Sequence, residues 1–560
     1  MAKEEGSTHH RRDVEAQDDA ITSGPKHPAP GEAVHDAKRE QETKHLGNLS
    51  RTLKSRHIQF LALAGAIGTG LFVGSGQVLS LAGPLSAFIS YAVTGFNLFC
   101  VINSLGEMAA WLPIPGAVPV FASRYVDEAL GWALGINYWY QFGIGVPIEV
   151  TVNIVILQYW DISAVSQAAL VSIFYLTYVA INCLPVRVWG EVEFFFGAVK
   201  LLTIVGLIIL MLIITLGGTP SGDMIGFRYW NNPGPMNEYL RDGALGRFLG
   251  FFKVFIQATF SYGGSEMVVV ASGETENPRR NIPRAVRRVF WRIAIFYVLS
   301  IFLVGLCVSS QDPRLLNAID RSAPGAAQSP FVIAVENASI KALPAILNGI
   351  ILSSAWSAGN SFFYASTRVL YSAALDGKAF KFLTFERWGV PYGCVAATSA
   401  LGALSFLSVS NEASEVFFWI SNISAVSTLI VWASECLIYL RFYHGLRYHG
   451  IDRDTLPYKS PFQPFLAWFG IVFCLTIALF NGFDCFFPGR FSAKTFIPPY
   501  INIPIFACLF LGYKFYKGTK FVKVQDMDLW SGKAEIDRLE PHWVVPKPRN
   551  FLERIWFWIA

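Results

Sequence analysis

Apolar runs of about 18 residues or more recur along the chain from residue 57 onward, and polar links separate them. A helix needs ~20 apolar residues, at ~1.5 Å each, to cross the hydrocarbon core of a bilayer. The pattern therefore predicts an all-α polytopic membrane protein with twelve transmembrane helices. The predicted spans cover residues 57–81, 83–112, 131–160, 167–184, 193–216, 247–271, 293–309, 344–375, 391–409, 413–440, 465–483 and 497–516.

The segments outside the apolar runs are polar, and their basic residues fall in alternate links. Residues 1–56 have the composition of a disordered tail, residues 57–517 form the membrane domain, and residues 518–560 form a second tail. Lysine and arginine in short links mark the cytoplasmic side of a membrane protein, so we expect both tails in the cytoplasm. The basic residues behind this prediction include Arg51, Lys54, Arg279, Arg288, Lys378, Arg387, Arg441, Arg453, Lys514 and Lys523.

Glycines crowd the middle of the first span, where Gly65-Ala66-Ile67-Gly68-Thr69-Gly70 occurs. Each glycine costs roughly 1 kcal/mol in a helix interior, so the cluster favours a break in the helix. Backbone groups freed in lipid survive only where protein or a polar cavity satisfies them. One hypothesis is therefore a discontinuous helix whose backbone holds a ligand. The other is a glycine face for close helix packing.

The sixth span repeats this interruption with Ser261-Tyr262-Gly263-Gly264-Ser265 at its centre. If spans one to five and six to ten are repeats, the two interruptions occupy corresponding positions. Paired interruptions of this kind indicate a secondary transporter with a binding site near the bilayer midplane. We expect two repeats of opposite orientation, at about 57–217 and 246–442, followed by two extra helices at about 462–517.

Several ionisable residues lie inside predicted spans, where a charge costs at least ~2.5 kcal/mol, and three of them are candidates for a functional role. Lys200 either pairs with Glu193 or acts as a proton-titrating or cation-mimicking ammonium. Glu149 either lines the substrate path, carries a proton, or is satisfied by amides at a helix end. Glu266 follows the second interruption, as a cap or a substrate contact. Lys200 and Glu266 are the candidate proton-coupling groups.

The composition agrees with a membrane protein and excludes several other classes. Hydrophobic residues make up 53% of the 560 and charged residues 15%, and the mean hydropathy is +0.40. The eight cysteines form no CxxC or metal-ligand spacing. Gly68-Thr69-Gly70 lacks the spacing of a dinucleotide fold, and the arginines at 279–292 are flanked by spans and anchor topology. We expect no enzyme activity, no cofactor or metal, and no nucleic-acid partner.

Several stretches carry a recognisable family pattern. They are LKSRHIQ at 53–59, GAIGTGLFVGSG at 65–76, GEVEF at 190–194 followed by Lys200, GETENPRRNIP at 273–283, and SAGNS at 357–361. Together they resemble the fungal amino-acid permeases, the yeast amino-acid transporter branch of the amino acid–polyamine–organocation superfamily. The resemblance runs from about residue 51 to the C-terminal tail.

The resemblance implies a LeuT-like fold with discontinuous helices 1 and 6, and proton-coupled amino-acid uptake by alternating access at the plasma membrane. Amides of Gly68, Thr69 and Gly70 would hold the substrate carboxylate at a half-helix N-terminus. Tyr262, Gly263 and Gly264 would shape the side-chain pocket, and Glu149 would line the path. Lys200 matches a lysine thought to replace a sodium ion in relatives. The carbonyls that would accept from the substrate ammonium are those of Ala66, Ile67, Phe260 and Ser261.

Two alternatives to amino-acid uptake remain open from the sequence. The Gly263-Gly264 pair resembles a divergent branch of the family that is associated with polyamine or carnitine uptake. In that case Glu149 and Glu266 would be the partners of an organic cation. The second alternative is a nutrient sensor that does not transport, which the short N-terminal tail disfavours. The family also implies ubiquitin ligase machinery as a partner of tail lysines, here Lys3, Lys26, Lys38 and Lys44.

Overall fold

The computed structural model describes residues 68–114, 116–160, 165–219, 222–266, 269, 277–320, 329–340, 342–410, 413–539 and 550. All of them belong to one compact unit, Leu49–Ala560. Ala66, Ile67, the tail lysines and residues 1–56 lie outside the described residues, so their predicted roles stay predictions. The described elements are helical, and the β-pairing among them is a single isolated bridge between Arg387 and Val390.

The helices follow the predicted spans in order. The first half of the chain forms α3 (Thr69–Phe72), α4 (Gly74–Trp111), α5 (Ala117–Tyr125), α6 (Glu128–Leu157), η1 (Gln158–Trp160), α7 (Gln167–Asn182), α8 (Val186–Thr215), α9 (Arg228–Asn231), α10 (Gly243–Lys253) and α11 (Phe255–Tyr262). The middle forms α13 (Pro278–Arg292), the π-helical η3 (Ile293–Leu299), α14 (Ser300–Cys307), α15 (Pro313–Asp320), α16 (Pro330–Asn337), α17 (Leu343–Leu375) and η5 (Lys381–Thr384). The rest forms α18 (Tyr392–Gly402), η6 (Ala403–Phe406), α19 (Leu407–Ser410), α20 (Ala413–Tyr448), η7 (Arg453–Thr455), α21 (Phe465–Phe480), η8 (Phe483–Phe486), α22 (Ala493–Tyr500), α23 (Asn502–Lys517), η9 (Val524–Asp526) and α24 (Lys533–Leu539).

The prediction of an all-helical polytopic membrane protein is confirmed. Within the described residues, seven helices are long and apolar enough to cross a membrane, or eight if α22 and α23, bent by 46°, form one span. Each predicted span contains helical residues, and the count of twelve stays a prediction. One long helix, α4, covers parts of two predicted spans. Gly83, at φ +81° and ψ 170°, interrupts this helix where the two spans meet.

The link predicted between spans six and seven was wrong in its extent. The arginine-rich residues after Asn277 form α13, which continues through η3 into α14, so the helix begins fifteen residues before the predicted span. The reason is an amphipathic pattern: the buried residues of α13 include Ile282, Val286 and Val289, spaced as one face of a helix. Because arginines interrupt the apolar residues, a search for uniformly apolar runs did not detect this helix.

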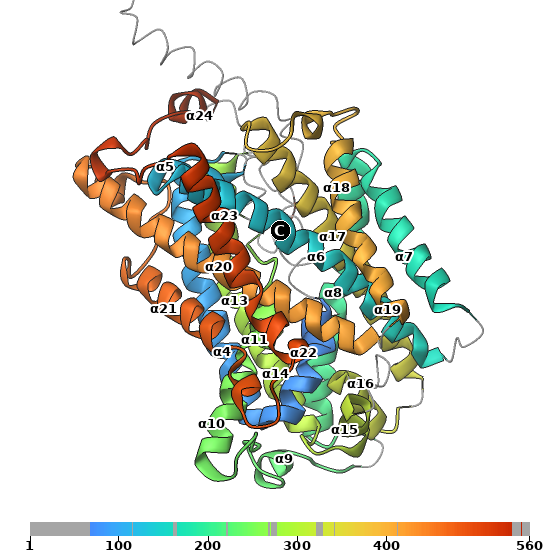
Figure 1. Cartoon of the computed structure of the whole chain (residues 1–560). Helices are drawn as coiled ribbons and strands as arrows, with labels where there is room; N and C mark the ends of the chain where they lie inside the picture. The colour runs from blue at the N-terminus through green and yellow to red at the C-terminus, as the bar shows by residue number, and fades with distance from the viewer. Residues whose placement is uncertain are drawn as a thin grey trace, which may run out of the picture. The chain divides into compact units, whose positions relative to one another are not determined.

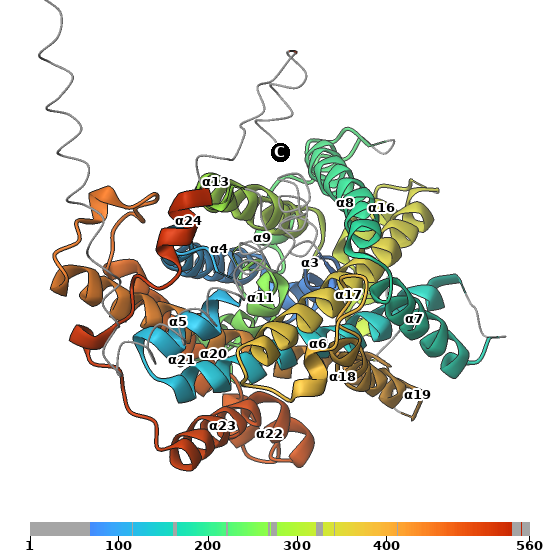
Figure 2. The same ribbon diagram turned by 90° about the horizontal axis from the view of Figure 1, so that it is seen from above.

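Three long helices form the centre of the unit. Helix α6 packs along α17, and α20 packs against α6 and α4. Figures 1 and 2 show α6 and α17 side by side in both views. Helix α11 contacts α4, α20 and α3, so the interrupted sixth span lies among these central helices. The shortest helix of the first span, α3, contacts α4, α11 and α17.

The basic links meet at one end of the helices, as the charge pattern predicts. Lys378 Nζ donates to Ser123 Oγ of α5 at 3.0 Å, and Arg441 Nε donates to the carbonyl of Tyr125 at 3.1 Å. Arg279 pairs with Asp537 of α24 at 2.6 Å. Figure 1 shows α5 and α24 at this end, with α9, α10 and α15 at the opposite end.

Candidate functional site

The described part of the first span starts with a short helix whose first three amides precede its first hydrogen-bonded turn. Gly68 has extended backbone angles (φ −142°, ψ −159°), and α3 begins at Thr69. The first amide that donates within this helix is that of Leu71, to the carbonyl of Gly68 at 3.2 Å. The amides of Gly68, Thr69 and Gly70 precede it, as the unpaired donors of a helix N-terminus do.

The sixth span breaks where the sequence predicts. Helix α11 ends at Tyr262, the chain leaves it at Gly263 (φ −55°, ψ 140°), and Gly264 has φ +87°. The amide of Gly263 donates to the carbonyl of Phe260 at 3.1 Å. The carbonyl of Phe260 is therefore already engaged, whereas it was predicted to accept from a substrate ammonium. Ser261 and Tyr262 lie at the last turn of α11.

The two interrupted spans touch at Gly70 and Ser261. A Cβ added at Gly70 would lie 2.6 Å from Ser261 Cα and 3.0 Å from Ser261 Oγ, far inside the usual ~3.5–4.0 Å contact. The Tyr91 hydroxyl and Ser261 Oγ share a hydrogen bond of 2.8 Å, and the Tyr262 hydroxyl donates to the carbonyl of Tyr91 at 3.0 Å. Helix α4 thereby holds the end of α11 against α3. Glycine at position 70 permits this close approach.

Glu149 joins α6 to the start of α3. Thr69 Oγ1 donates to Glu149 Oε1 at 2.9 Å, and Glu149 Oε2 is buried and accepts no hydrogen bond from the described residues. A Cβ at Gly68 would lie 3.8 Å from the same Oε1. The structure thus brings together the glycine-rich start of α3 and the carboxylate predicted to line the substrate path.

Lys200 is buried on α8 beside two carboxylates. Its charge interacts with those of Glu193, on the same helix, and Glu149. Both Glu193 oxygens accept from Ser357 Oγ, at 3.1 Å each, in the SAGNS stretch of α17. The ion-pair interpretation and the proton-coupling interpretation of Lys200 are therefore compatible, because one lysine faces two glutamates.

A small cavity adjoins the break in the sixth span. It lies between the end of α11 and helices α6, α17 and α20. Phe260, Gly263 and Gly264 line it, whereas Tyr262, which the sequence also assigned to the side-chain pocket, is not among its lining residues. The other lining residues are Gln141, Phe142, Gly145, Phe362, Ser424 and Thr428. None of these nine side chains carries a charge.

Glu266 lies directly behind this cavity. It is fully buried, and its Oε1 accepts from Gln141 Nε2 at 3.0 Å. Because Gln141 also lines the cavity, one side chain of α6 connects Glu266 to the space at the helix break. The sequence alternatives for Glu266 were a cap or a substrate contact. The structure places an amide side chain between the carboxylate and the cavity.

The two interrupted helices, and the cavity beside the second of them, coincide with a sequence match over most of the chain. Residues 57–526 match the amino acid permease family. The chain belongs to the amino acid permease family. The permease is similar to the proline-specific permease of Emericella nidulans (43% identity over 513 residues, covering 91% of this chain and 93% of that protein).

Two further relatives are also amino-acid permeases of fungi. A probable proline-specific permease of Schizosaccharomyces pombe is 43% identical over 501 residues, covering 89% of this chain and 90% of that protein. The dicarboxylic amino acid permease of Saccharomyces cerevisiae is 39% identical over 512 residues, covering 91% and 83%. Membership in this family makes the chain an amino-acid transport protein of the membrane.

A solved structure supports the fold of the permease. The crystal structure of the Eremococcus coleocola manganese transporter, bound to an aromatic bis-isothiourea substituted compound, aligns with a TM-score of 0.53 at 11% identity. The match covers 84% of this chain and 98% of that one. At this identity the likeness concerns the fold alone, which is a LeuT-like transporter fold.

Sequence reasoning missed the tenth span as part of the cavity of the permease. Ser424 and Thr428 of α20 line the cavity, and both are buried. They stand four residues apart inside an apolar helix, so they share one face of it. A search for polar residues at helical spacing within each span would have found them. The sequence predicted pocket and path residues in spans three and six, and the structure adds Phe362 of span eight and these two hydroxyls of span ten.

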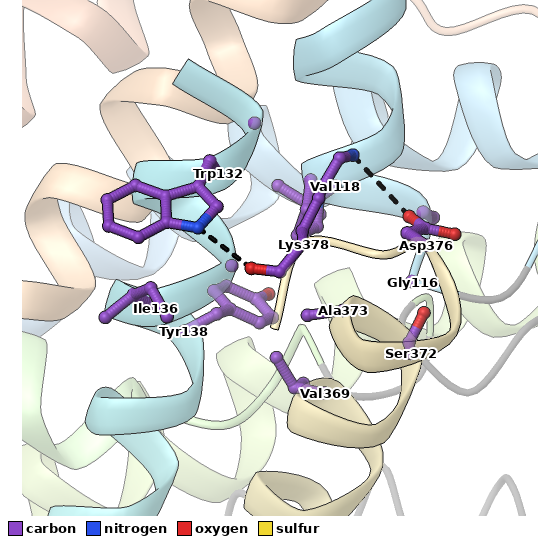
Figure 3. Close-up of a pocket in the computed structure, with 14 residues that line it drawn as sticks. Gly116, Val118, Trp132, Ile136, Tyr138, Val369, Ser372, Ala373, Asp376 and Lys378 are labelled. Carbon is purple, nitrogen blue, oxygen red and sulfur yellow. Dashed lines mark hydrogen bonds and ion pairs between the residues drawn. The ribbon is translucent and has the colours of Figure 1, made fainter. Parts of the chain in front are cut away.

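A second cavity of the permease opens at the end where the basic links meet (Figure 3). Its empty volume is about 460 Å³, and it lies between α5, the start of α6 and the end of α17. Lys378 and Asp376 pair at its rim at 3.5 Å, and Trp132 Nε1 donates to the carbonyl of Lys378 at 2.9 Å. Tyr138 lines its inner part. This cavity contains none of the predicted site residues.

Proposed function

We propose that this chain is a proton-coupled permease that takes up amino acids with small uncharged side chains, proline among them, across the plasma membrane. The observation that carries the proposal is the uncharged cavity between the broken sixth span and helices α6, α17 and α20. It adjoins the break in the sixth span, and secondary transporters bind substrate at interrupted helices of this kind.

The carboxylate of the substrate would bind at the start of α3. Amides at positions 68–70 precede the first amide that donates within the helix, and helix N-termini favour anions. Thr69 and Glu149 border this position and fix each other by their hydrogen bond. The ammonium group would meet the carbonyl of Ser261, together with Ala66 and Ile67 of the preceding segment.

The side chain of the substrate would enter the cavity at Gly263 and Gly264. Phe142, Phe260 and Phe362 supply apolar contact, and Ser424 and Thr428 supply hydroxyl groups. A cationic or anionic side chain would meet no opposite charge among these lining residues. The proline-specific names of the two relatives at 43% identity agree with such a pocket. The same lining disfavours polyamines and carnitine, whose permanent charges need partners.

Proton coupling would use Lys200 and Glu266. Lys200 lies with Glu149 and Glu193 on the side of the first span, and Glu266 lies behind the cavity of the sixth. Both groups are buried, so a change in charge on either would change the relative stability of the conformations that the helices around the substrate adopt. Residues 57–217 and 246–442 would rock as inverted repeats during alternating access.

The orientation proposed places both termini in the cytoplasm. The links that carry Arg279, Lys378 and Arg441 share one end of the helices. Basic links mark the cytoplasmic side, so this end would face the cytoplasm and the end with α9, α10 and α15 would face outward.

The proposed substrate class is tested by counterflow exchange in liposomes that contain the purified full-length chain. Liposomes preloaded with unlabelled proline are given labelled proline outside, and unlabelled lysine, glutamate, spermidine or carnitine is added as competitor. We expect proline and other small neutral amino acids to compete, and the charged compounds to leave exchange unchanged. Stronger competition by lysine or spermidine than by proline would contradict the proposal.

A further inference from the structure

A second buried carboxylate, on α20, lies near Glu266 and has no place in the site described so far. Glu435 is fully buried inside the membrane domain, and its Oε1 accepts from the Tyr138 hydroxyl at 3.2 Å. The charges of Glu435 and Glu266 interact, and both also act on Tyr138. Two acidic side chains from distant parts of the chain, residues 266 and 435, therefore share one interior region.

Helix α6 holds both carboxylates through side chains on one face. Tyr138 donates to Glu435 and Gln141 donates to Glu266, and these donors stand three residues apart. Side chains at this spacing are neighbours on the helix surface, ~5–6 Å apart at Cβ. The two carboxylates are thus presented to adjacent positions of the same helix.

One oxygen of each carboxylate lacks a well-placed hydrogen-bond donor among the described residues, although backbone amides at Gly264 and Glu266 also act on the Glu266 carboxylate. Glu266 Oε2 and Glu435 Oε2 are buried and accept no hydrogen bond from the described residues. The indole of Trp432 lies beside Glu266, and its Nε1 is likewise buried without an acceptor at hydrogen-bond geometry. These atoms belong to side chains with no accessible surface. A buried carboxylate pair with free oxygens binds a cation or a proton far more readily than it bears two charges.

The charged and titratable groups around Glu435 include no cation. Helix α6 contributes Tyr138, and the break in span six contributes Glu266. Thiols complete the surroundings: Cys436 of α20, Cys474 of α21 and Cys100 of α4. In the part of the chain that the structure describes, neither glutamate forms an ion pair with lysine or arginine. The transfer proposed below starts from one proton held on Glu266, with the carboxylate of Glu435 ionised.

The two donors on α6 also connect two different cavities. Gln141 lines the uncharged cavity at the break in span six, and Tyr138 lines the cavity at the end where the basic links meet (Figure 3). The two glutamates stand behind these two donors. A proton held by the pair consequently has a route from the substrate cavity toward the opposite cavity.

We propose that Glu435 is a proton-transfer residue that relays the coupling proton from Glu266 to the cavity at the end of the basic links. The O–H bond of Glu266 breaks and an O–H bond of Glu435 forms, so one proton moves and the negative charge moves in the opposite direction. The Glu435 carboxyl then gives its proton to the Tyr138 hydroxyl oxygen, while the O–H bond of Tyr138 breaks and its proton passes to water of the second cavity, which Tyr138 lines. The proposal rests on the proposed proton-coupled uptake and adds the exit of the proton.

The test compares Glu435→Gln with wild type in liposomes. Counterflow exchange without a gradient measures substrate binding and conformational change, and accumulation under an inward proton gradient measures coupling. Groups that transfer protons contribute typically ~10²–10⁴-fold in rate, so we expect at least a ~10-fold loss of gradient-driven accumulation. Counterflow should persist, because Gln keeps an acceptor for Tyr138. Glu435→Asp should recover part of the accumulation.

A matched control is Glu128→Gln, since Glu128 is an exposed carboxylate at the start of α6. This variant should accumulate proline as wild type does. If Glu435→Gln accumulates proline like wild type, or loses counterflow together with accumulation, the relay is refuted and the residue is dispensable or structural. If wild type itself fails to accumulate under the gradient, the proposed function fails instead.

Discussion

The contact between the two interrupted spans makes Gly70→Ala a demanding test of the site geometry. The added methyl group would lie 2.6 Å from Ser261 Cα, about 1 Å closer than the ~3.5–4.0 Å at which carbon atoms pack. Both atoms belong to backbone segments, so α3 and the end of α11 must separate. Overpacking of this kind costs typically ~1–3 kcal/mol of stability. A shift of ~1 Å between substrate-positioning groups costs on the order of 10²-fold in rate.

Gly68→Ala provides the matched control in the same motif. Its methyl group would lie 3.6 Å from Ala358 Cβ, an ordinary contact, and Gly68 has backbone angles that alanine adopts. Thermal unfolding in detergent and the initial rate of labelled proline uptake in liposomes are the two assays. We expect Gly70→Ala to lower both and Gly68→Ala to leave the unfolding temperature unchanged. Wild-type stability and uptake in Gly70→Ala would refute the packing of α3 on α11.

Three further variants test separate contacts. Thr69→Val removes the donor to Glu149 and leaves a buried carboxylate unpaired, which costs about 1–3 kcal/mol; thermal unfolding should show the loss, and Thr69→Ser should restore it. Gly145→Ala places a methyl group 2.7 Å from a phenyl ring of α17, so proline uptake should fall while surface expression persists. Asp127 caps α6 and pairs with Lys514. Burial alone would raise the pKa of Asp127. Hydrogen bonds from Lys514, a threonine hydroxyl and a backbone amide outweigh burial and lower this pKa below its usual 3.8. Asp127→Asn should therefore unfold at a lower temperature than wild type near pH 7, and the difference should vanish as the pH falls through the lowered pKa.

Each of these variants has an outcome that contradicts the reasoning. Unchanged unfolding in Thr69→Val would mean that the Glu149 carboxylate does not depend on this hydroxyl. Full uptake in Gly145→Ala would show that the cavity wall is not tightly packed there. A stability difference that grows at acidic pH in Asp127→Asn would reverse the sign of the linkage and exclude a native carboxylate with a lowered pKa.

The apolar runs predicted where the helices lie, because span length and hydropathy are properties of local sequence. The start of α13 was not predicted, because arginines alternate with its buried residues and lower the average hydropathy of the segment. The break at Tyr262–Gly264 was predictable because glycine and serine weaken a helix wherever it lies. The continuity of α4 on both sides of Gly83 was not predictable. Local sequence preference says little about the angle between two successive helical segments.

The sequence identified polar residues of the site, but it did not predict which side chains they contact. Thr69, Glu149 and Glu266 stood out because polar groups are expensive inside a membrane. Their pairing depends on which faces of α3, α6 and α20 meet, and that is decided by tertiary packing. Ser424, Thr428 and Glu435 all lie in the predicted tenth span, but their places beside α6 became visible only once α20 was packed there.

The most direct test of the account is accumulation of labelled proline by liposomes that contain the purified chain, with and without an inward proton gradient. The account predicts that proline accumulates above its external concentration only with the gradient, and that a protonophore abolishes the accumulation. Equal internal and external proline under both conditions would contradict proton-coupled uptake.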